Sequence, residues 1–499
     1  MHKTKYDIVI IGSGLGGLLS GALLAKNGKR VCVLEKHYQI GGNLQVFSRN
    51  GCRFSAGMHY AGSLDKDQIV YKIFNYLNIY KDLKIKRLDI DNFERIIIGD
   101  KEYSYAQGAD NFKHKLISYF PDEQNAIERY CKKLDEVWNY SNLLNLRPLN
   151  FDEMPLFEEY KENAYEYICS ITDNEELRNV LAATNGLYIG NKHKTPLFIH
   201  ANINNFYIKS AWRIAEDGAN MANLLADIIT TNGGAVLPNN EVVKLNFKDE
   251  SIVSATVESG KSYFADHFIS DIHPVNTFDL TEPGKLRKVY IKRIQKLENS
   301  ISAFVLFIVL KKKTVKHINS NIYYSKDVSV WDSYDYTESS WPKGYMMYTT
   351  EDNKHKGYAE SVVVISMMKF DDVKKWEHTK VMHRGDEYLR FKELKQSKLL
   401  DLTAVKFPEI KNNIDHIYSA SPLTFRDYTG TPEGSMYGIV KDNNNPLGTF
   451  LSPKTKIPNL LLTGQNIGLH GLLGVIMSSF QTCSALIDIN SVLTKIKTF

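Results

Sequence analysis

The sequence predicts a two-domain α/β protein, with a doubly wound parallel sheet in one domain and an antiparallel sheet plus helices in the other. Three observations predict it. The chain has 499 residues, more than one hydrophobic core usually holds. It opens with an apolar β-branched run, a helical segment and a second such run, the pattern of a βαβ unit. Helix-rich and strand-rich stretches then alternate.

The opening unit gives the clearest elements. Residues 8–11 and Val31–Leu34 are continuous apolar runs, typical of strands that are buried on both faces. Between them, Leu15–Lys26 is expected to form a helix that stops before Gly28. The two strands are therefore predicted to be parallel neighbours in one sheet.

The pattern changes twice along the rest of the chain. From about residue 65 to 200 it predicts longer helices, for example over 110–120 and 124–144. After a predicted helix at 220–231, strands are expected over the following ranges: 242–247, 252–257, 267–270, Ser302–Leu310, 345–349, 361–368 and 459–463. A helix over 472–488 is expected to close the chain.

These changes predict that both domains are discontinuous. The first domain is assigned residues 1–65, 205–285 and 440–499. The second is assigned residues 66–204 and 286–439, and we expect the helices before residue 200 to form a lid over the antiparallel sheet.

Composition excludes several classes. Lys and Arg number 62 and Asp and Glu 57, a net charge of +5 that gives no reason to expect nucleic acid and does not oppose an anionic membrane surface. The five cysteines show no CxxC spacing, and the scattered His, Asp and Glu show no metal-ligand spacing, so we expect no disulfide framework and no metal.

The chain gives no sign of a targeting or spanning segment. No signal peptide is recognisable before the first predicted strand. The longest apolar run, 301–310, is about half of the roughly 20 residues that a spanning helix needs. We therefore expect a cytoplasmic protein whose membrane contact, if any, is peripheral.

The first chemical motif is a GxGxxG at residues 12–17, directly after a predicted strand and at the start of a predicted helix. Gly12 permits the tight turn, Gly14 lets the backbone approach a pyrophosphate, and Gly17 lets the helix pack close to the sheet. The helix N-terminus then presents free N–H groups to the phosphates. Gly12, Ser13, Gly14, Leu15 and Gly17 are thus predicted to bind a dinucleotide.

A second motif extends the first. Glu35 ends the second predicted strand, where a carboxylate accepts hydrogen bonds from both hydroxyls of an adenosine ribose and disfavours a 2′-phosphate. Lys36 follows it, and Gly41 and Gly42 come shortly after. Glycines at these positions let the chain fold beside the dinucleotide without side-chain clash.

This extension resembles the amine-oxidase-like superfamily of two-domain flavoproteins, in which the stretch lines FAD. The resemblance implies a Rossmann-type FAD-binding domain for the first set of segments and a substrate-binding or lid domain for the second. It implies FAD as the tightly held cofactor, with Lys36, Gly41 and Gly42 beside it. The superfamily also has a valine whose backbone contacts adenine, a position that Val242 would match.

A third motif lies more than 400 residues further along the chain. A predicted strand ends at Gly464-Gln465, and a glycine-rich turn and a helix with Gly474 and Val475 follow. The segment resembles the C-terminal FAD motif of the same superfamily, in which an Asp usually binds the ribityl chain. Gln465 stands at that position, and an amide still bonds a hydroxyl. A glycine-rich loop that only closes the fold is the alternative.

Further segments narrow the resemblance. Residues 57–60, 421–428, 434–438 and 466–474 look like the branch of carotenoid isomerases, phytoene-type desaturases and retinol saturases. The resemblance covers essentially the whole chain, and the Met-His-Tyr and Leu-His-Gly elements look closest to retinol saturases, which are retinol 13,14-reductases, and to carotenoid isomerases. It implies an FAD-dependent oxidoreductase that acts on carbon–carbon double bonds of a hydrophobic polyene or isoprenoid taken from a membrane.

Saturase-like reduction is the leading expectation, with desaturation or cis–trans isomerisation as the alternative. His59 and His470 lie in segments that the family places near the flavin, so they are candidates to supply a proton; histidines that only bond nearby backbone are the competing interpretation. NAD or NADP would serve only as a transient electron donor. A flavin amine oxidase and a prenyl-lipid carrier of the GDP-dissociation-inhibitor type remain alternatives.

Overall fold

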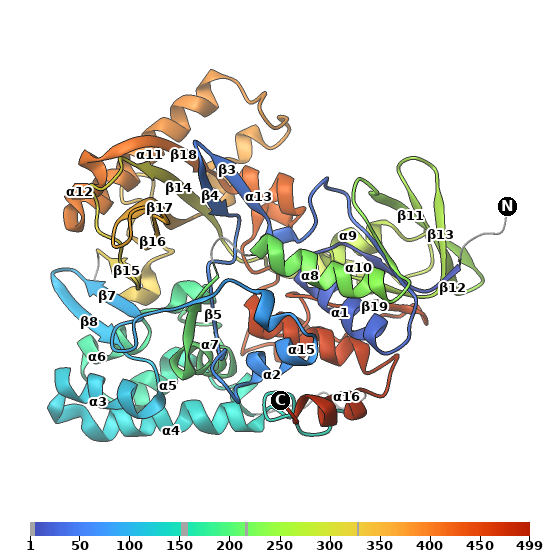
Figure 1. Cartoon of the computed structure of the whole chain (residues 1–499), viewed down its shortest axis with the longest axis horizontal. Helices are drawn as coiled ribbons and strands as arrows, with labels where there is room; N and C mark the ends of the chain where they lie inside the picture. The colour runs from blue at the N-terminus through green and yellow to red at the C-terminus, as the bar shows by residue number, and fades with distance from the viewer. Residues whose placement is uncertain (1–4, 151–157, 215–217, 327–328) are drawn as a thin grey trace.

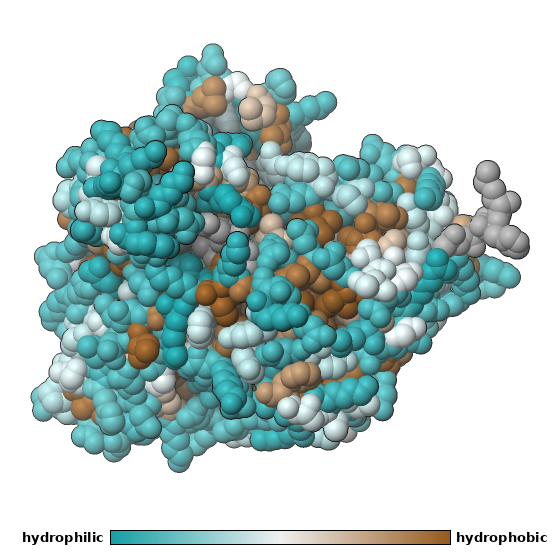
Figure 2. Space-filling model, viewed as in Figure 1, coloured by the Kyte–Doolittle hydropathy of each residue, from teal (hydrophilic) through white to brown (hydrophobic). Residues whose placement is uncertain are grey.

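The computed structural model describes residues 5–150, 158–214, 218–326 and 329–499. Figure 1 shows two lobes side by side, each built on one large sheet. The expectation that no signal peptide precedes the fold depends partly on residues 1–4, which lie outside the described part. Figure 2 shows one face of the molecule, where hydrophilic residues cover most of the surface and hydrophobic ones come to it mainly near the middle, around helix α8 (Gly218–Thr231).

The opening βαβ unit forms as predicted. Strand β1 (Lys5–Ile11) and strand β2 (Val31–Leu34) are parallel neighbours, with Ile8 opposite Val31. Helix α1 (Leu15–Lys26) connects them and is almost completely buried. The chain leaves the helix through Gly28, whose positive φ of 84° is readily adopted only by glycine.

The first sheet is mixed, whereas the sequence predicted a parallel one. Its order is β10-β2-β1-β13-β12-β11, and β19 also pairs with β13. Strands β10, β2, β1, β13 and β19 are parallel to one another, while β11 and β12 continue the sheet from β13 as antiparallel strands. The bounds are β10 (Ala235–Leu237), β11 (Val242–Lys248), β12 (Ser251–Val257), β13 (Ser262–Ser270) and β19 (Leu460–Leu462). The difference arises because β13 has nine residues, and β12 and β19 pair with successive parts of the same edge.

Both faces of this sheet are covered. Ile8 and Ile10 of β1 pack in the core with α1, α8 and α15 (Gly471–Cys483). Val9 and Ile11 point to the other face and pack with residues of the antiparallel strands β11 and β12 and the short helices α9 (Pro274–Asp279) and α10 (Lys288–Gln295). Successive side chains of β1 therefore point alternately into the two layers that cover the sheet.

The second lobe contains the predicted antiparallel sheet, of order β18-β14-β17-β16-β15-β7-β8. Only the β15–β7 pair is parallel. The bounds are β7 (Glu94–Ile98), β8 (Lys101–Tyr105), β14 (Ser302–Leu310), β15 (Asn321–Ser325), β16 (Gly344–Glu351), β17 (Ala359–Met368) and β18 (Ile414–Ala420). Helix α11 (Asp386–Lys406) packs with one face, and the other face joins the large core shared with the first lobe.

Helices occupy the region before residue 200 as expected, with small departures at their ends. The longer helices there are α2 (Ile69–Tyr76), α3 (Ala109–Tyr119), α4 (Gln124–Tyr140), α5 (Ala164–Ile171) and α7 (Leu197–Lys209). The prediction of one closing helix over 472–488 was wrong. Helix α15 ends at Cys483, and the Asp488 side chain accepts the backbone N–H groups of Asn490 and Ser491, which starts a further helix, α16 (Ile489–Ile496).

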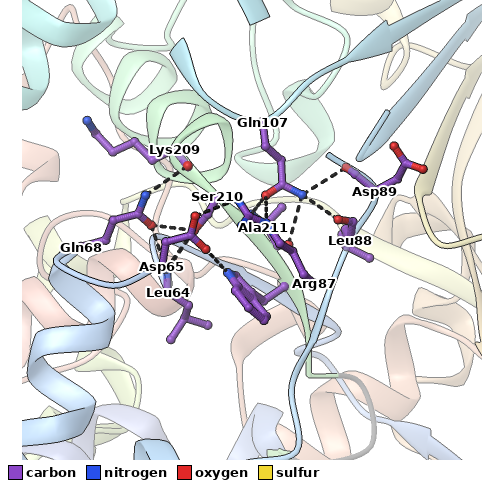
Figure 3. A network of polar contacts seen from close by, with 11 residues as sticks. Leu64, Asp65, Gln68, Arg87, Leu88, Asp89, Gln107, Lys209, Ser210 and Ala211 are labelled. Carbon is purple, nitrogen blue, oxygen red and sulfur yellow. Dashed lines mark hydrogen bonds and ion pairs between the residues drawn. The ribbon is translucent and has the colours of Figure 1, made fainter. Parts of the chain in front are cut away.

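A polar network holds a small three-stranded sheet between the lobes (Figure 3). This sheet has the order β5 (Tyr60–Gly62), β9 (Ala211–Arg213) and β6 (Lys86–Arg87). The Asp65 carboxylate accepts hydrogen bonds from Arg87 at 2.7 Å and from the Trp212 indole at 3.0 Å. Gln107 accepts from the Ala211 amide at 3.0 Å. The network fixes β9, and β9 in turn pairs with Tyr60.

Candidate functional site

The glycine turn after β1 has the predicted geometry. Gly12 has a φ of 94°, and its amide donates to the Leu34 carbonyl at 2.8 Å. A Cβ atom at Gly17 would lie 2.2 Å from the Gly12 carbonyl oxygen, so only glycine lets α1 pack this close to the turn. The N-terminus of α1 therefore points at the turn, the arrangement that binds phosphate groups.

The Glu35 carboxylate lies at this turn, as the spacing predicted. Glu35 is 8% exposed. One oxygen accepts from the Ser13 amide at 3.0 Å and the Ser13 hydroxyl at 2.6 Å, and the other accepts from the His37 amide at 2.8 Å. Lys36 next to it is exposed, and Val242 is buried at the start of β11. Their contacts to a ribose or an adenine stay predictions.

The Gly41-Gly42 extension folds directly onto the turn. Both residues have positive φ, 111° and 55°. The Gly41 amide donates to the Ser13 carbonyl at 3.0 Å. A Cβ atom at Gly42 would lie 3.2 Å from the Gly14 Cα. Glycine is thus needed here for close approach of two backbone segments.

The C-terminal motif lies beside the same turn. Gly464 has a φ of 86° and donates to the Ser478 hydroxyl at 3.1 Å. A Cβ atom at Gly474 would lie 2.0 Å from the Leu469 carbonyl carbon. The glycines therefore let the turn after β19 close tightly against α15.

Sequence reasoning missed Asp271, the residue directly after β13. Its carboxylate lies against both glycine turns: a Cβ atom at Gly14 would lie 2.5 Å from its Oδ2, and one at Gly464 would lie 2.4 Å from its Oδ1. Burial raises the pKa of Asp271 to about 7, opposed by the Gly17 amide and assisted by the charge of Glu35. Its position directly after a predicted strand could have indicated this place, because the carboxyl ends of neighbouring parallel strands meet at one edge of a sheet.

One cavity of about 250 Å³ is lined by residues of all three motifs and of the second lobe. Leu15, Gly41, Gln465 and Val475 line it. Its second-lobe lining is mainly apolar and aromatic, including Ile96, Ile98, Tyr323, Met346, Ile365 and Met367. Segments that are up to 460 positions apart thus meet around one space.

Aromatic residues form much of the cavity lining. Tyr323, Tyr324, Tyr334 and Trp341 line the cavity, whereas Trp331 and Tyr336 do not. Tyr60, Tyr207 and Tyr437 also line it. The cavity wall therefore carries many phenol hydroxyl groups on an apolar background.

His59 lines this cavity. Its ring stacks on Tyr348, with the ring centres 4.9 Å apart and the planes 8° from parallel. Its Nε2 is buried without a hydrogen-bond partner among the described residues. Burial lowers the pKa of His59 to about 3, and the Arg213 guanidinium contributes. The imidazole is thus neutral at pH 7, which weighs against the proton-donor role expected from sequence.

His470 lies in a second, much smaller hollow of about 20 Å³. Its Nε2 lies 3.2 Å from the Leu187 carbonyl, and its ring packs on Tyr437 at 4.4 Å. Burial lowers its pKa to about 3 as well. Tyr437 borders both spaces, so it separates His470 from the cavity that His59 lines.

Two basic residues near the motifs have structural partners. Lys441 is buried under the C-terminal motif, where its ammonium group donates to the carbonyls of Thr449 and Asn466 at 2.8 Å each. Burial lowers its pKa to about 7. Arg426 forms an ion pair with Asp427.

The fold and the cavity between the lobes define the class of protein, a two-lobed protein with a Rossmann-like dinucleotide-binding sheet. Residues 10–77 match the family model of the NAD(P)-binding Rossmann-like domain. Among the described helices, none is long and apolar enough to cross a membrane. The described residues also include no group of three or more His, Cys, Asp or Glu placed to hold a metal ion.

The chain has sequence relatives that cover nearly its whole length. It is 27% identical to the all-trans-retinol 13,14-reductase of Danio rerio, over 96% of this chain and 86% of that protein. It is 25% identical to prolycopene isomerase 2 of an Oncidium hybrid cultivar, over 60% of this chain and 56% of that protein. The expected resemblance to retinol saturases and carotenoid isomerases is confirmed.

Solved structures share the fold. An oxidoreductase from Methanosarcina mazei has a TM-score of 0.63 at 18% identity, over 96% of this chain and all of that one. Cyclohexylamine oxidase from Brevibacterium oxydans has a TM-score of 0.62 at 13% identity, over 98% of this chain and all of that one. The amine-oxidase-like architecture is therefore confirmed for the fold.

Proposed function

We propose that this protein is an FAD-dependent oxidoreductase that saturates a carbon–carbon double bond of a polyene or isoprenoid lipid. The observation that carries the proposal is the single cavity in which residues of three dinucleotide motifs meet an apolar, aromatic chamber. A polyene has few polar groups, so a site for it must rely on apolar walls, while a cofactor performs the redox step. The names of the relatives agree with this class of reaction.

The described residues fit FAD. Gly12, Ser13, Gly14, Leu15 and Gly17 would hold the pyrophosphate at the N-terminus of α1. Glu35 would hold the ribose, with Lys36, Gly41, Gly42 and Val242 along the adenosine half. Gly464, Gln465, Gly474 and Val475 would lie along the flavin half. When bound, FAD would supply hydride chemistry, and NAD or NADP would act only as a transient electron donor.

The chain's own contribution is to orient the substrate, exclude water and supply a proton. The apolar lining from β7, β15 and β16 excludes water from the chamber. Neutral His59 and His470 would then shape the site near the cofactor, and a proton would come from another group. Desaturation or isomerisation in the same cavity remains the alternative, because the relatives include a prolycopene isomerase.

The test begins with the absorption spectrum of the purified protein. A flavin spectrum supports the proposal, and its absence favours the carrier alternative. Anaerobic incubation of the reduced protein with retinol, carotenes and other prenyl polyenes then decides the reaction by product mass. A gain of two hydrogens supports saturation, whereas an unchanged mass with altered retention means isomerisation.

We also propose a cytoplasmic location with peripheral membrane contact, because a polyene partitions into lipid. Flotation with vesicles that contain anionic lipid would measure this contact. Recovery of the protein only in the vesicle-free fraction would contradict it.

A further inference from the structure

A buried carboxyl group lies next to the cavity and takes no part in the proposed cofactor site. Glu94 begins β7 and is only 1% exposed. Its neighbour across the sheet is Asn321 of β15, whose amide donates to Glu94 Oε1 at 3.4 Å. Glu94 Oε2 has no hydrogen-bond partner among the described residues. An acid so deeply buried and so poorly solvated is costly unless it keeps its proton or serves a function.

The sheet geometry places Glu94 on the face of β7 that packs in the core shared by the two lobes. In a strand, alternate residues share a face, so Glu94 lies on the same side of β7 as Ile96, which belongs to this core and also lines the cavity. On β15, Asn321 and Tyr323 share the corresponding face. The Tyr60 hydroxyl lies close enough to the Glu94 carboxyl group to stabilise its charged form.

Two tyrosine hydroxyls connect this acid to the open space. The hydroxyl groups of Tyr60 and Tyr323 lie 3.0 Å apart, a hydrogen bond in which either can donate. Both side chains line the cavity. The Tyr60–Tyr323 pair thus reaches from the cavity wall to the side of the buried acid, and a proton would cross to it from the unpartnered Glu94 carboxyl group.

Burial, against the opposing effect of its neighbours, keeps Glu94 protonated at neutral pH. Arg213 is the cation that acts on it, but the two form no ion pair, because the guanidinium donates to the Asn321 side-chain oxygen at 2.7 Å. The remaining titratable groups that act on Glu94 or are acted on by it are Tyr60, Tyr105, Tyr207 and Tyr323, from β5, β8, α7 and β15. Burial raises the pKa of all four and raises the pKa of Glu94 to about 8.

We propose that Glu94 is the proton store of the cavity and that Tyr60 and Tyr323 deliver its proton to the substrate. This inference rests on the proposed function. Saturation breaks one π bond and forms two C–H bonds: reduced flavin is the reductant that supplies a hydride, and a tyrosine hydroxyl supplies the proton. The tyrosinate takes a proton from Glu94, and water later reprotonates the carboxylate. Glu94 acts through the tyrosines and is therefore a positioning residue.

The first test compares Glu94→Gln with Glu102→Gln in the flavin-loaded protein. Glu102 lies on the neighbouring strand β8, but it is exposed and pairs with Arg95, so it serves as the control. We expect Glu94→Gln to slow substrate-dependent flavin reoxidation by roughly 100-fold or more, the usual scale of general acid help. The parent rate should fall as pH rises through about 8, as Glu94 loses its proton, and the variant should lack this fall. A variant within a few-fold of the parent at every pH would overturn the inference.

A second measurement does not depend on turnover. At pH 7 the infrared spectrum of the parent should contain a buried protonated carboxyl band that Glu94→Gln removes and Glu102→Gln retains. No change in that band would overturn the inference even if the protein reduces a polyene. A parent that shows the band and binds flavin but reduces no polyene would instead overturn the proposed function.

The two tyrosines provide a further check. Tyr60→Phe and Tyr323→Phe each remove one hydroxyl and leave the ring in place. If the path is correct, the double variant should be slowed at least as much as Glu94→Gln, with its flavin spectrum unchanged. A double variant that retains the parent rate and pH profile would contradict delivery through this pair.

Discussion

The hydroxyl groups of Tyr60 and Tyr323 lie 3.0 Å apart, although 263 positions separate these residues in the chain. Tyr60 belongs to the small sheet between the lobes, and Tyr323 belongs to the large sheet of the second lobe. The pair therefore depends on how β5 is held, and β5 is held by β9 and the Asp65 network (Figure 3).

This dependence predicts a stability effect at Asp65. Asp65→Ala would leave the Arg87 guanidinium and the Trp212 indole without their shared acceptor. We expect a loss of about 1 to 3 kcal/mol in the free energy of unfolding, measured by denaturant titration. Asp67→Ala is the control, because the Asp67 side chain is 70% exposed and its ion pair with Lys72 is long, at 3.9 Å. Equal losses in both variants would show that the network contributes nothing specific.

Glu35→Gln should weaken FAD retention. The variant keeps the shape of the side chain but loses one charge-assisted hydrogen bond to a ribose, a cost of about 1.5 to 3 kcal/mol. Ser13→Ala controls for the internal contact, because Ser13 donates to the same carboxylate. The measurement is the FAD dissociation constant of the apoprotein. A constant that Glu35→Gln leaves unchanged would place the ribose elsewhere.

Gly14 requires a test that separates two causes. The sequence predicts that a side chain there excludes the pyrophosphate, whereas in the structure a Cβ atom at Gly14 would also lie 2.5 Å from Asp271 Oδ2. We expect Gly14→Val to lose flavin and the double variant Gly14→Val, Asp271→Gly to stay without it. Circular dichroism would check that both variants fold. Recovery of flavin in the double variant would assign the need for glycine to Asp271.

Glu94 and the buried histidines should make stability depend on pH in opposite directions. The pKa of Glu94 is raised from 4.5 to about 8, so the native state holds a proton that the unfolded state loses, and the free energy of unfolding falls as pH rises in this window. The pKa values of His59, His200 and His470 are lowered from 6.5 to about 3, so stability also falls as pH drops below 6.5.

Glu94→Gln should remove the fall in stability that Glu94 contributes between pH 4.5 and about 8. Denaturant titrations at several pH values would compare the parent with the variant. If the free energies of unfolding of the two proteins change equally across this range, Glu94 does not hold its proton in the native state.

The two histidines should be dispensable as acids. Burial keeps both neutral at pH 7, so we expect His59→Phe and His470→Phe to bind FAD and to turn over within a few-fold of the parent. Stopped-flow flavin reoxidation would measure this. A rate loss of roughly 10² to 10⁴ in either variant would instead support the proton-donor role expected from its motif.

Several elements of the first lobe could be predicted from the sequence, because apolar runs and glycines within a few residues determine them. The run Val31–Leu34 and the helix Leu15–Lys26 have the predicted bounds, and glycines with positive φ occur at Gly12, Gly41 and Gly464. The mixed sheet was not predictable in this way, because it depends on which strands share the edge of β13. The pairing of β12 and β19 with successive parts of β13 is a tertiary contact, and the hydrophobic periodicity of a single strand does not predict it.

The motifs identified backbone segments that meet in the structure, but they did not identify side chains that meet across the lobes. Leu15, Gly41, Gln465 and Val475 line one cavity, and their contacts to a cofactor stay predictions. Glu94 was missed because it precedes an ordinary apolar run and is paired with Asn321 only in the folded sheet. The histidines were chosen because they lie in motifs, and sequence alone does not show the burial that lowers their pKa values.

The place of β19 on the edge of β13 has a consequence for synthesis of the protein. Strand β19 begins at Leu460, and the cavity needs Gln465 and Val475 from the segment that follows. The sheet that contains β1 is therefore completed by β19, the last strand among the described residues. A nascent chain that has been made only as far as residue 459 would leave this part of the β13 edge unpaired and would lack Gln465 and Val475 from the cavity wall.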